Sequence, residues 1–431
     1  MNSMIEASNP TIIDKENWFP YLKEVSNDLK DEFVLRNIID QPTIDQLLKL
    51  SDIALMELCR QKSFEYGFRL WHQDDQKNVH FVNTHVFNNA IKNNENIETW
   101  MKRAFPEKEI CIIMNNVEHF ADEIAVVLSN FFKSVYENLG IPMNGLHSTS
   151  IFGNYGFTPL GIHHDTRGSF VMNIHLGPSI KKMYIWEWDK FEALGGKTNE
   201  KNIEKYLPYA KVYIINPGDM FFMPWNKYHI GYTDGFSLSM TNWFDFHTAL
   251  RLLSDLTAFM SSQFLKLKED FISKSVTEFT YQKHFEDLLG KFLFEGGREH
   301  VSLKENLLDA HDFKMLKLFS NCGWKGIPLT RQYESGLSLS NFDMLKDRAV
   351  KVTNPFKIYT KIQKGNLYVI SRGHISQYPY SKKLELIIEK LNTHEAFNTN
   401  DLVIDKPDNW SDETLQYFLL SLYNYKSIEI I

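Results

Sequence analysis

Two short segments of the chain carry side chains that could bind one metal ion together. His163 and Asp165 lie two positions apart in the first segment, and His229 lies in the second, beyond a Pro-Gly-Asp turn signal. Two imidazoles and one carboxylate form a facial set of ligands that leaves coordination positions open. Such a set suits a non-haem Fe(II) ion that must also hold a cosubstrate and O2.

The spacing of the first two residues favours a strand. Residues two apart on a strand point the same way, so His163 and Asp165 can project together into a barrel while His164 points outward. The third ligand must come from a distant strand, and the apolar run 220–223 leads toward His229. A His-x-Asp pair alone also fits an exposed turn, so the interpretation depends on the strands that follow.

Several runs after the first motif have strand character. They are residues 170–176, 181–186 and the run that leads to the second motif, with a Gly-Pro-Ser turn between the first two. This order describes a double-stranded β-helix, the cupin or jelly-roll barrel, whose mouth is a natural ligand site. The run 237–243 is typical of the last barrel strand, with Ser239 and Thr241 on one face, and the pattern leaves open which face lies inside.

Length and composition allow more than one domain. The 431 residues are 43% apolar, which suffices for two or three cores. Apolar residues recur at helical spacing after residue 248, and strands alternate with helices near the end, as in a winged helix. We therefore expect an α+β protein with a barrel domain and its helical lead-in at 1–248, a helical domain at 249–350 and a winged-helix-like domain at 351–431.

Charge and cysteine content exclude several classes of function. The net charge of −7 argues against a general nucleic-acid binder but tolerates a basic protein or peptide partner. Residues 351–431 hold 10 Lys plus Arg against 9 Asp plus Glu, without the basic excess of a DNA reader. Three isolated cysteines fit a reducing compartment, and neither a signal peptide nor a membrane span is recognisable. We expect a cytoplasmic protein.

The motifs resemble those of a known family. Gly161-x-His163-x-Asp165, a basic pair before an aromatic strand, and Pro217-Gly-Asp followed by His229-x-Gly-Tyr look like JmjC-type oxygenases, above all the ribosomal oxygenase branch. These cupin-like enzymes hydroxylate ribosomal proteins with Fe(II), 2-oxoglutarate and O2. The motifs cover roughly residues 140–245, and the layout of helical segment and winged-helix-like end extends the resemblance over most of the remainder.

The resemblance implies an Fe(II)/2-oxoglutarate-dependent dioxygenase with His163, Asp165 and His229 as iron ligands. The family's basic residue for the distal carboxylate of 2-oxoglutarate falls on Lys182, which shares strand parity with Tyr184 and Trp186. The hairpin before it is about four residues longer than the family's usual turn, so Lys181 is the alternative.

Two polar residues join Lys182 as candidates for contact with 2-oxoglutarate. Asn173 occupies a position where relatives usually have Gln, and Ser239 lies on the predicted last strand. His175 shares the parity of Asn173, and either could equally be a satisfied polar residue of the core. His147 enters the first motif, as pocket lining or as plain core.

The substrate and the partners follow from the resemblance alone. It implies a side chain of a ribosomal protein, with Arg or His typical of the branch, and a homodimer formed through residues 249–350. That segment could instead pack against its own barrel. Two other functions remain open: a tailoring hydroxylase of a ribosomally made peptide, whose leader the C-terminal domain would hold, and a metal-sensing cupin regulator without oxygenase activity.

Overall fold

The computed structural model describes residues 17–62, 64, 67–246, 248–263, 283, 286, 301–335, 344, 345 and 347–431. In these residues the fold is of the mixed α+β class, and all paired strands run antiparallel. The predicted α+β class is thus confirmed. Across the same residues, no helix combines the length and the apolar character that crossing a membrane requires.

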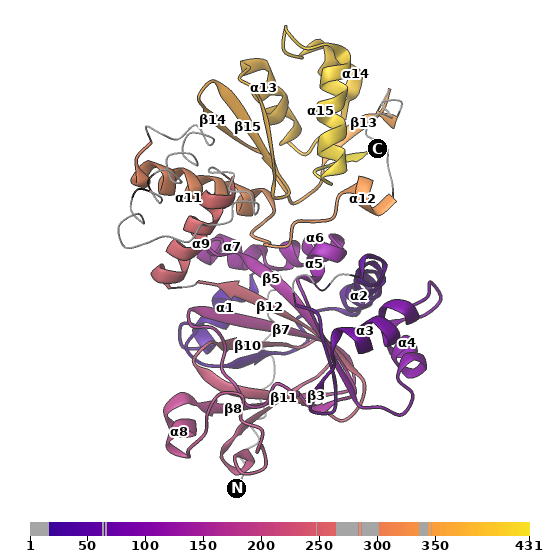
Figure 1. The fold of residues 1–431 in the computed structure, drawn as a ribbon, viewed down its shortest axis with the longest axis vertical. Coiled ribbons are helices and arrows are strands. Elements are labelled where there is room, and N and C mark those ends of the chain that lie inside the picture. Colours follow the sequence, from indigo (N-terminus) through magenta and orange to yellow (C-terminus); the bar gives the residue numbers. More distant parts are fainter. Residues whose placement is uncertain are drawn as a thin grey trace.

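Two facing sheets form the barrel (Figure 1). The larger sheet consists of β1 (Phe33–Leu35), β2 (Arg69–His72), β3 (Asp75–Gln76), β4 (Ile110–Asn115), β5 (Leu146–Gly153), β7 (Ser169–Pro178), β10 (Met220–Pro224) and β12 (Ser237–Asp245). The smaller sheet consists of β6 (Gly156–Phe157), β8 (Lys181–Glu187), β9 (Lys211–Ile215) and β11 (Lys227–Thr233). Their strand orders in the described chain are β1-β10-β7-β12-β5-β4-β2-β3 and β6-β11-β8-β9.

Side chains alternate between the two faces of the larger sheet. On β7 and β12, Met172 and Met240 pack outward with the helices, whereas Asn173 and Thr241 point toward the smaller sheet. A second, smaller apolar cluster fills part of the space between the sheets and includes Val171, Met183 and Ile185. The inner face is therefore partly polar, which leaves room for a ligand cavity.

Helices cover the outer face of the larger sheet. They are α1 (Trp18–Val25), α2 (Gln41–Gln61), α4 (Ile97–Ala104), α5 (Val117–Phe120), α6 (Glu123–Phe131) and α7 (Lys133–Leu139). The sequence predicts one helix over 118–139, but this run is broken after α5, because the backbone is extended at Ala121 and the Asp122 carboxylate pairs with Lys426 and Arg372. The sequence also predicts a strand at 79–87, where the structure instead has α3 (Val79–His85), which Asn78 caps.

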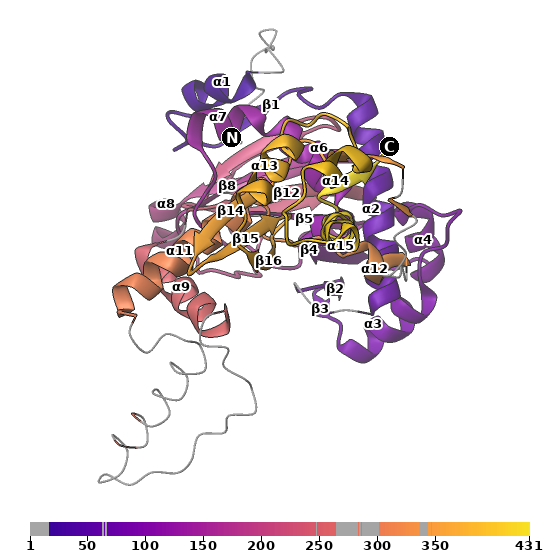
Figure 2. The same cartoon turned by 90° about the horizontal axis from the view of Figure 1, so that it is seen from above.

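Beyond the barrel, α9 (Ala249–Gln263) packs against α11 (Leu303–Ser320). The sequence also predicts a helix at 276–294, which falls almost wholly outside the described residues. The last part of the chain has its own core and contains α12 (Arg331–Ser335), β13 (Ala349–Val352), β14 (Tyr359–Gln363), β15 (Asn366–Ser371), β16 (His374–Pro379), α13 (Lys382–Leu391), β17 (Phe397–Asn398), α14 (Thr399–Ile404), α15 (Asp412–Asn424) and β18 (Ile428–Ile430). Seen from above, this C-terminal module lies over the barrel (Figure 2).

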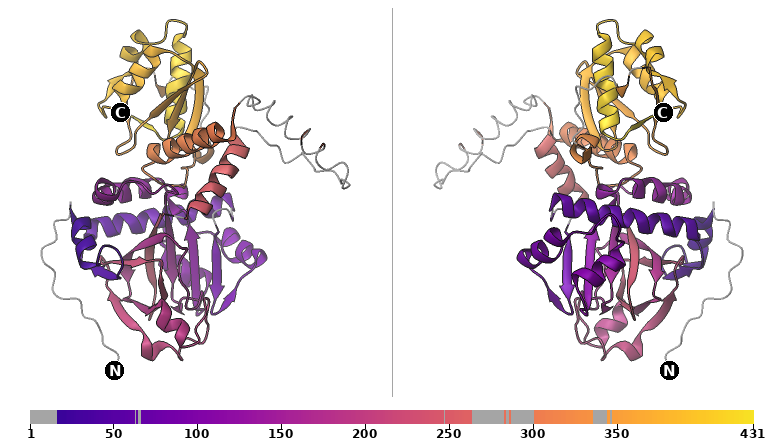
Figure 3. Two further views of the ribbon diagram at one scale, coloured as in Figure 1. Left: turned by 90° about the vertical axis from the view of Figure 1, so that its left-hand side faces the viewer. Right: turned by 90° about the vertical axis from the view of Figure 1, so that its right-hand side faces the viewer.

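The C-terminal module lies above the helices that cover the barrel (Figure 3). Arg372 Nη1 and Lys426 Nζ of the module pair with the Asp122 carboxylate, directly before α6, at 3.4 and 2.7 Å. Arg372 is buried, lies over the ring of Phe356 and donates to Asn321 Oδ1 at 3.0 Å. Immediately after α11, the chain returns to the barrel: Leu146 N–H donates to Gly323 O at 2.7 Å, and Lys325 N–H donates to Leu146 O at 2.8 Å. This main-chain pairing fixes the end of α11 against the start of β5.

Candidate metal centre and its cavity

The backbones of His163 and His229 are paired directly. The N–H of His163 donates to His229 O at 3.1 Å, and the N–H of His229 donates to His163 O at 2.7 Å. The two ring centroids are 4.3 Å apart. Two residues separated by more than sixty positions are thus held side by side by main-chain hydrogen bonds, independent of their side chains.

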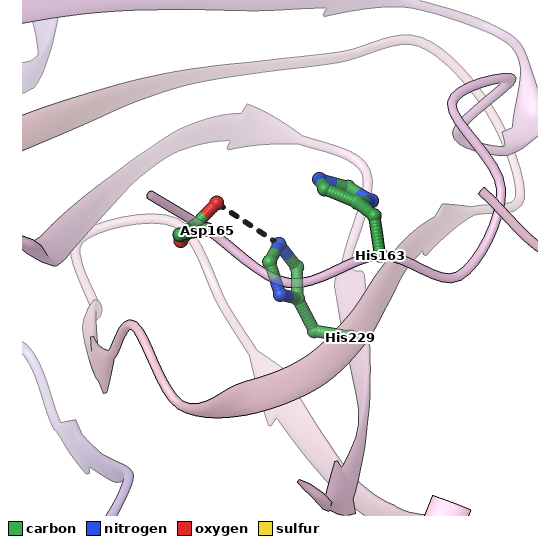
Figure 4. Close-up of side chains that lie close together, drawn as sticks. All are labelled: His163, Asp165 and His229. Atoms are coloured by element: carbon green, nitrogen blue, oxygen red, sulfur yellow. Dashed lines mark ion pairs between the residues drawn. The ribbon is translucent and has the colours of Figure 1, made fainter. Parts of the chain in front are cut away.

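His163, Asp165 and His229 form a compact group of ligand atoms (Figure 4). One atom from each residue lies within 4.8 Å of the others, and His229 Nε2 is 3.9 Å from Asp165 Oδ1. Nδ1 of His163 lies 2.9 Å from Gly161 O, and Nδ1 of His229 lies 3.4 Å from Lys227 O. With Nδ1 protonated toward a carbonyl, each ring presents the Nε2 lone pair to a metal.

Burying these three side chains without a bound cation is energetically unfavourable, because they lose contact with water. Burial raises the pKa of Asp165 to about 8, with a smaller contribution from Asp245, and it lowers the pKa of His163 and of His229. Asp165 Oδ2 has no hydrogen-bond partner. Two neutral imidazoles and a buried carboxylate with an unpartnered oxygen fit a divalent metal ion, which would stabilise the ionised carboxylate. His164 points away and packs against Trp188, as predicted, although residues 163–165 lie in a connecting segment with an isolated β-bridge at His163 and not in the predicted strand.

A cavity of about 350 Å³ lies between the two sheets and includes all three residues. The larger sheet contributes Arg69, Ile113, Asn115, His147, Thr149, Ile151, Val171, Asn173, Phe221, Met223, Thr241, Trp243 and Asp245. The smaller sheet contributes Lys181, Met183, His229 and Gly231, and the connecting segments contribute Thr158, Leu160, His163, Asp165, Thr166 and Lys325. This size is typical of a site for a small organic ligand.

The structure places Lys181, and not Lys182, in the cavity. Lys181 is 2% exposed, and its Nζ donates to Ser239 Oγ at 3.0 Å. Lys182 lies on the outer face, where its Nζ is 3.5 Å from Asp234 Oδ2 and lies over the ring of Tyr232. The expectation for Lys182 is therefore corrected, and the alternative Lys181 has the position of a cavity cation.

The error came from the choice of face, because the parity itself is right. Lys182 shares its face with Tyr184 and Trp186, as expected, but this is the outer face, where Trp186 packs with Phe191 of α8 (Trp188–Ala193). Lys181 shares the inner face with Met183 and Ile185. Tyr184 and Trp186 suggested a pocket lining, but they lie on the outer face of β8, where α8 and the loop after it cover them.

The other two predicted contact residues lie close to Lys181 or to the triad. Asn173 lines the cavity and donates to Thr241 Oγ1 at 2.6 Å, which leaves its Oδ1 without a partner. Ser239 is buried behind Lys181 and lies 3.3 Å from His175 Nδ1. Burial and the nearby Lys181 lower the pKa of His175 to about 4, so the ring is neutral. Neutral partners leave the ammonium of Lys181 uncompensated.

A second group of residues lines the cavity, of which the sequence offered only His147, as pocket lining or as core, whereas Trp243, Asp245, Lys325 and Arg69 were missed. His147 stacks on Trp243 with their planes 2° apart, and its Nδ1 lies 3.4 Å from Asp245 Oδ2. Asp245 also pairs with Lys325 and holds the Ser169 hydroxyl at 2.9 Å. Arg69 lines the cavity from β2. Only the parity of β12 offered a signal, because Trp243 and Asp245 share the face of Ser239.

The fold and the site together define a mixed α+β protein whose two facing antiparallel sheets enclose a candidate His-Asp-His metal centre. Comparison with known proteins finds no matching family model and no matching curated protein.

Solved structures do match. YcfD, a ribosomal oxygenase from Escherichia coli, is 14% identical, with 96% of this chain and 98% of that chain covered and a TM-score of 0.47. A structure of YcfD in complex with cobalt and succinic acid matches with the same values. SnoN, a non-heme alpha-ketoglutarate-dependent epimerase from nogalamycin biosynthesis, is 7% identical, with 52% of this chain and 84% of that chain covered and a TM-score of 0.30.

Proposed function

We propose that the protein is an Fe(II)- and 2-oxoglutarate-dependent dioxygenase that hydroxylates an amino-acid side chain of a protein substrate. The observation that carries this proposal is the presence, in one cavity, of His163, Asp165 and His229 together with a buried lysine that has no carboxylate partner. A facial triad alone is compatible with several metals and reactions. The additional cation restricts the ligand to one that is anionic.

Lys181 supplies the second half of the argument. Burial lowers its pKa to about 8, so the ammonium form is present at neutral pH at a cost. Among the described residues, no carboxylate lies within ion-pair distance of its Nζ, and its one hydrogen bond goes to a neutral hydroxyl. Buried charges are normally paired. A dicarboxylate such as 2-oxoglutarate would supply the missing partner with one end while its keto acid end binds the metal.

The surrounding residues support that placement. Gly231 faces Lys181, and a Cβ at this position would lie 3.3 Å from Lys181 Cε and 3.4 Å from Met183 Sδ. The absent side chain leaves space beside the ammonium. Ser239 orients Nζ from behind, and Asn173 and Thr241 add polar groups on the neighbouring wall. In this proposal, Lys181 and Ser239 orient the cosubstrate. Apolar side chains of the cavity wall, among them Val171 and Phe221, exclude water.

When bound, Fe(II) with 2-oxoglutarate and O2 supplies the oxidising power that inserts oxygen into a C–H bond, with succinate and CO2 as coproducts. His163, Asp165 and His229 would hold the ion, and Asp165 would give up its proton as the ion binds. The remainder of the cavity, on the side of His147 and Trp243, is available to the side chain that is hydroxylated.

The test is anaerobic addition of 2-oxoglutarate to the Fe(II)-loaded protein, with detection of the visible charge-transfer band. Lys181→Met is compared with Lys182→Met, which removes an adjacent lysine of the outer face. We expect the band in the wild type and in Lys182→Met, and an affinity for 2-oxoglutarate at least about tenfold weaker in Lys181→Met, because a charge-assisted contact is lost. No band in the wild type, or equal affinity in both variants, would refute the proposal.

A further inference from the structure

A second cation, Arg69, faces the cavity without a partner. It lies on β2 opposite Ile113 of β4, and its side chain lines the cavity. Its Nε is buried and has no hydrogen bond, and its guanidinium carbon lies 5.6 Å from the centroid of the Trp71 ring. In the described part of the chain, no carboxylate lies within ion-pair distance of it.

Arg69 projects into the cavity from the larger sheet and Lys181 from the smaller sheet, and the charge of each acts on the buried thiol of Cys111. Lys181 bonds to Ser239 on β12, and β5 and β4 lie between β12 and β2 in the sheet. The charge of Arg69 also reaches the candidate metal centre, because it is among the causes that lower the pKa of His163. The cavity therefore holds two unpaired cations near one triad.

The carboxylates of the described lining are already engaged. They are Asp165, which belongs to the ligand set, and Asp245, which pairs with Lys325, lies 3.4 Å from His147 Nδ1 and accepts from Ser169. A substrate guanidinium or ammonium group would find no free carboxylate there. A substrate carboxylate would find a free guanidinium, whose fork of donors matches it.

We propose that Arg69 binds a carboxylate of the primary substrate and so selects an acidic group next to the carbon that reacts. The inference rests on the proposed function and specifies its substrate class: a peptide or protein segment that presents an Asp or Glu side chain, or a chain-terminal carboxylate, to β2. It departs from the Arg or His side chain that the family resemblance implies. The cosubstrate and the substrate then have one cation each, Lys181 and Arg69.

The experiment uses the full chain, loaded with metal and 2-oxoglutarate without O2, and three N-acetylated tetrapeptides of otherwise identical sequence, of which the first two are also amidated at the C-terminus. One contains Asp, the second has Asn in its place, and the third has Asn and a free C-terminal carboxylate. Binding is followed by ligand-observed NMR titration. We expect the wild type to bind one of the carboxylate peptides at least about tenfold tighter than the neutral one, as a charged hydrogen bond implies. Which of the two binds tighter identifies the source of the carboxylate.

Three variants make the result specific. We expect Arg69→Gln to bind the acidic and the neutral peptides with about equal affinity, and Arg69→Lys to retain the preference for the acidic peptide. Arg251→Gln, which removes an exposed arginine of α9, should leave this preference unchanged. Loss of an unpaired cation does not lower the melting temperature of Arg69→Gln, so a folding defect is recognised separately. Equal binding of acidic and neutral peptides by the wild type, no binding of either acidic peptide, or an undiminished preference in Arg69→Gln overturns the inference.

The two proposals fail in different ways. Affinity for 2-oxoglutarate, measured on the same samples, depends on Lys181 and stays within about twofold of wild type in Arg69→Gln if the cations serve different ligands. If the wild type does not bind 2-oxoglutarate, the proposed function is refuted. If the wild type binds 2-oxoglutarate but shows no preference for the acidic peptides, only the role of Arg69 is refuted.

Discussion

Lys181 and Lys182 are adjacent in the chain but lie on opposite faces of β8. Nζ of Lys181 donates to the buried hydroxyl of Ser239 at 3.0 Å inside the barrel, and Nζ of Lys182 lies 3.5 Å from the exposed carboxylate of Asp234 outside it. Water screens the charge of Lys182, whereas the ammonium group of Lys181 has lost its hydration, which is energetically unfavourable. Two identical side chains thus differ in their value for binding an anion.

The first prediction is a pH dependence of cosubstrate affinity. The pKa of Lys181 is lowered to about 8 by burial, so the ammonium loses its proton as pH rises through that value. Affinity for 2-oxoglutarate should therefore be constant below about pH 7 and fall above about pH 8, approaching tenfold per pH unit. Calorimetric titration across this range checks it. Lys181→Arg should remove the fall, and pH-independent affinity in the wild type would contradict the assignment.

The second prediction concerns metal binding. Asp165→Ala removes the only anionic ligand and should lower Mn(II) or Co(II) affinity more than about 100-fold, since even outer partners of a ligand are worth up to that amount. Asp234→Ala, which removes an exposed aspartate of the outer face, should bind as the wild type does. Metal-dependent thermal shifts and equilibrium dialysis measure both. Wild-type affinity in Asp165→Ala would exclude this residue as a ligand.

The third prediction concerns stability and pH. Glu118 of α5 is buried and accepts from Ser148 N–H at 3.1 Å, and burial raises its pKa to about 7. The folded state therefore binds this proton more tightly than the unfolded state. Its stabilising contribution is complete below about pH 4.5 and is lost as pH rises to about 7, on the order of 3 kcal/mol in total.

Glu118→Gln should remove this pH dependence. Urea unfolding at about pH 5 and about pH 8 compares the variant with the wild type, and Glu137→Gln, an exposed position on α7, is the matched control and should change stability by less than about 0.5 kcal/mol. An unchanged pH profile in Glu118→Gln would show that Glu118 is ionised in the folded state throughout this range.

The fourth prediction concerns assembly. The helix pair α9 and α11 exposes Leu250 at 76%, together with Leu253, Leu303 and Leu308, and we predict that this surface joins two copies of the chain. Light scattering after gel filtration should give a dimer. Leu250→Glu with Leu253→Glu should give a monomer, whereas Leu386→Glu on α13, also exposed, should not. A monomeric wild type would refute the prediction.

The candidate metal ligands could be read from the sequence because their pattern is local. The two-residue spacing of His163 and Asp165 predicted that both side chains point the same way, although the structure has only an isolated β-bridge at His163 there, and a turn signal precedes the strands that lead to His229. The α+β class followed from the same kind of periodicity. The interruption of the helix at Asp122 could not be predicted, because its cause is a pair of partners, Arg372 and Lys426, about 250 and 304 positions away.

The cations of the cavity show more clearly what could not be predicted from the sequence. Parity separates Lys181 from Lys182 but does not say which face is covered, and that depends on α8 packing from outside. Arg69 and Lys325 carry no local signal at all. They reach the cavity through the strand order of the larger sheet and through the return of the chain after α11, which are tertiary relationships.

The pairing of Leu146 with Gly323 and Lys325 has a mechanical consequence. It clamps the end of α11 to the first residue of β5, directly before His147, and Lys325 itself reaches Asp245 in the cavity wall. Residues 321–324 connect the end of α11 directly to the lining residue Lys325. A partner that binds to α11 and shifts it would therefore also shift His147 and Lys325 in the cavity wall.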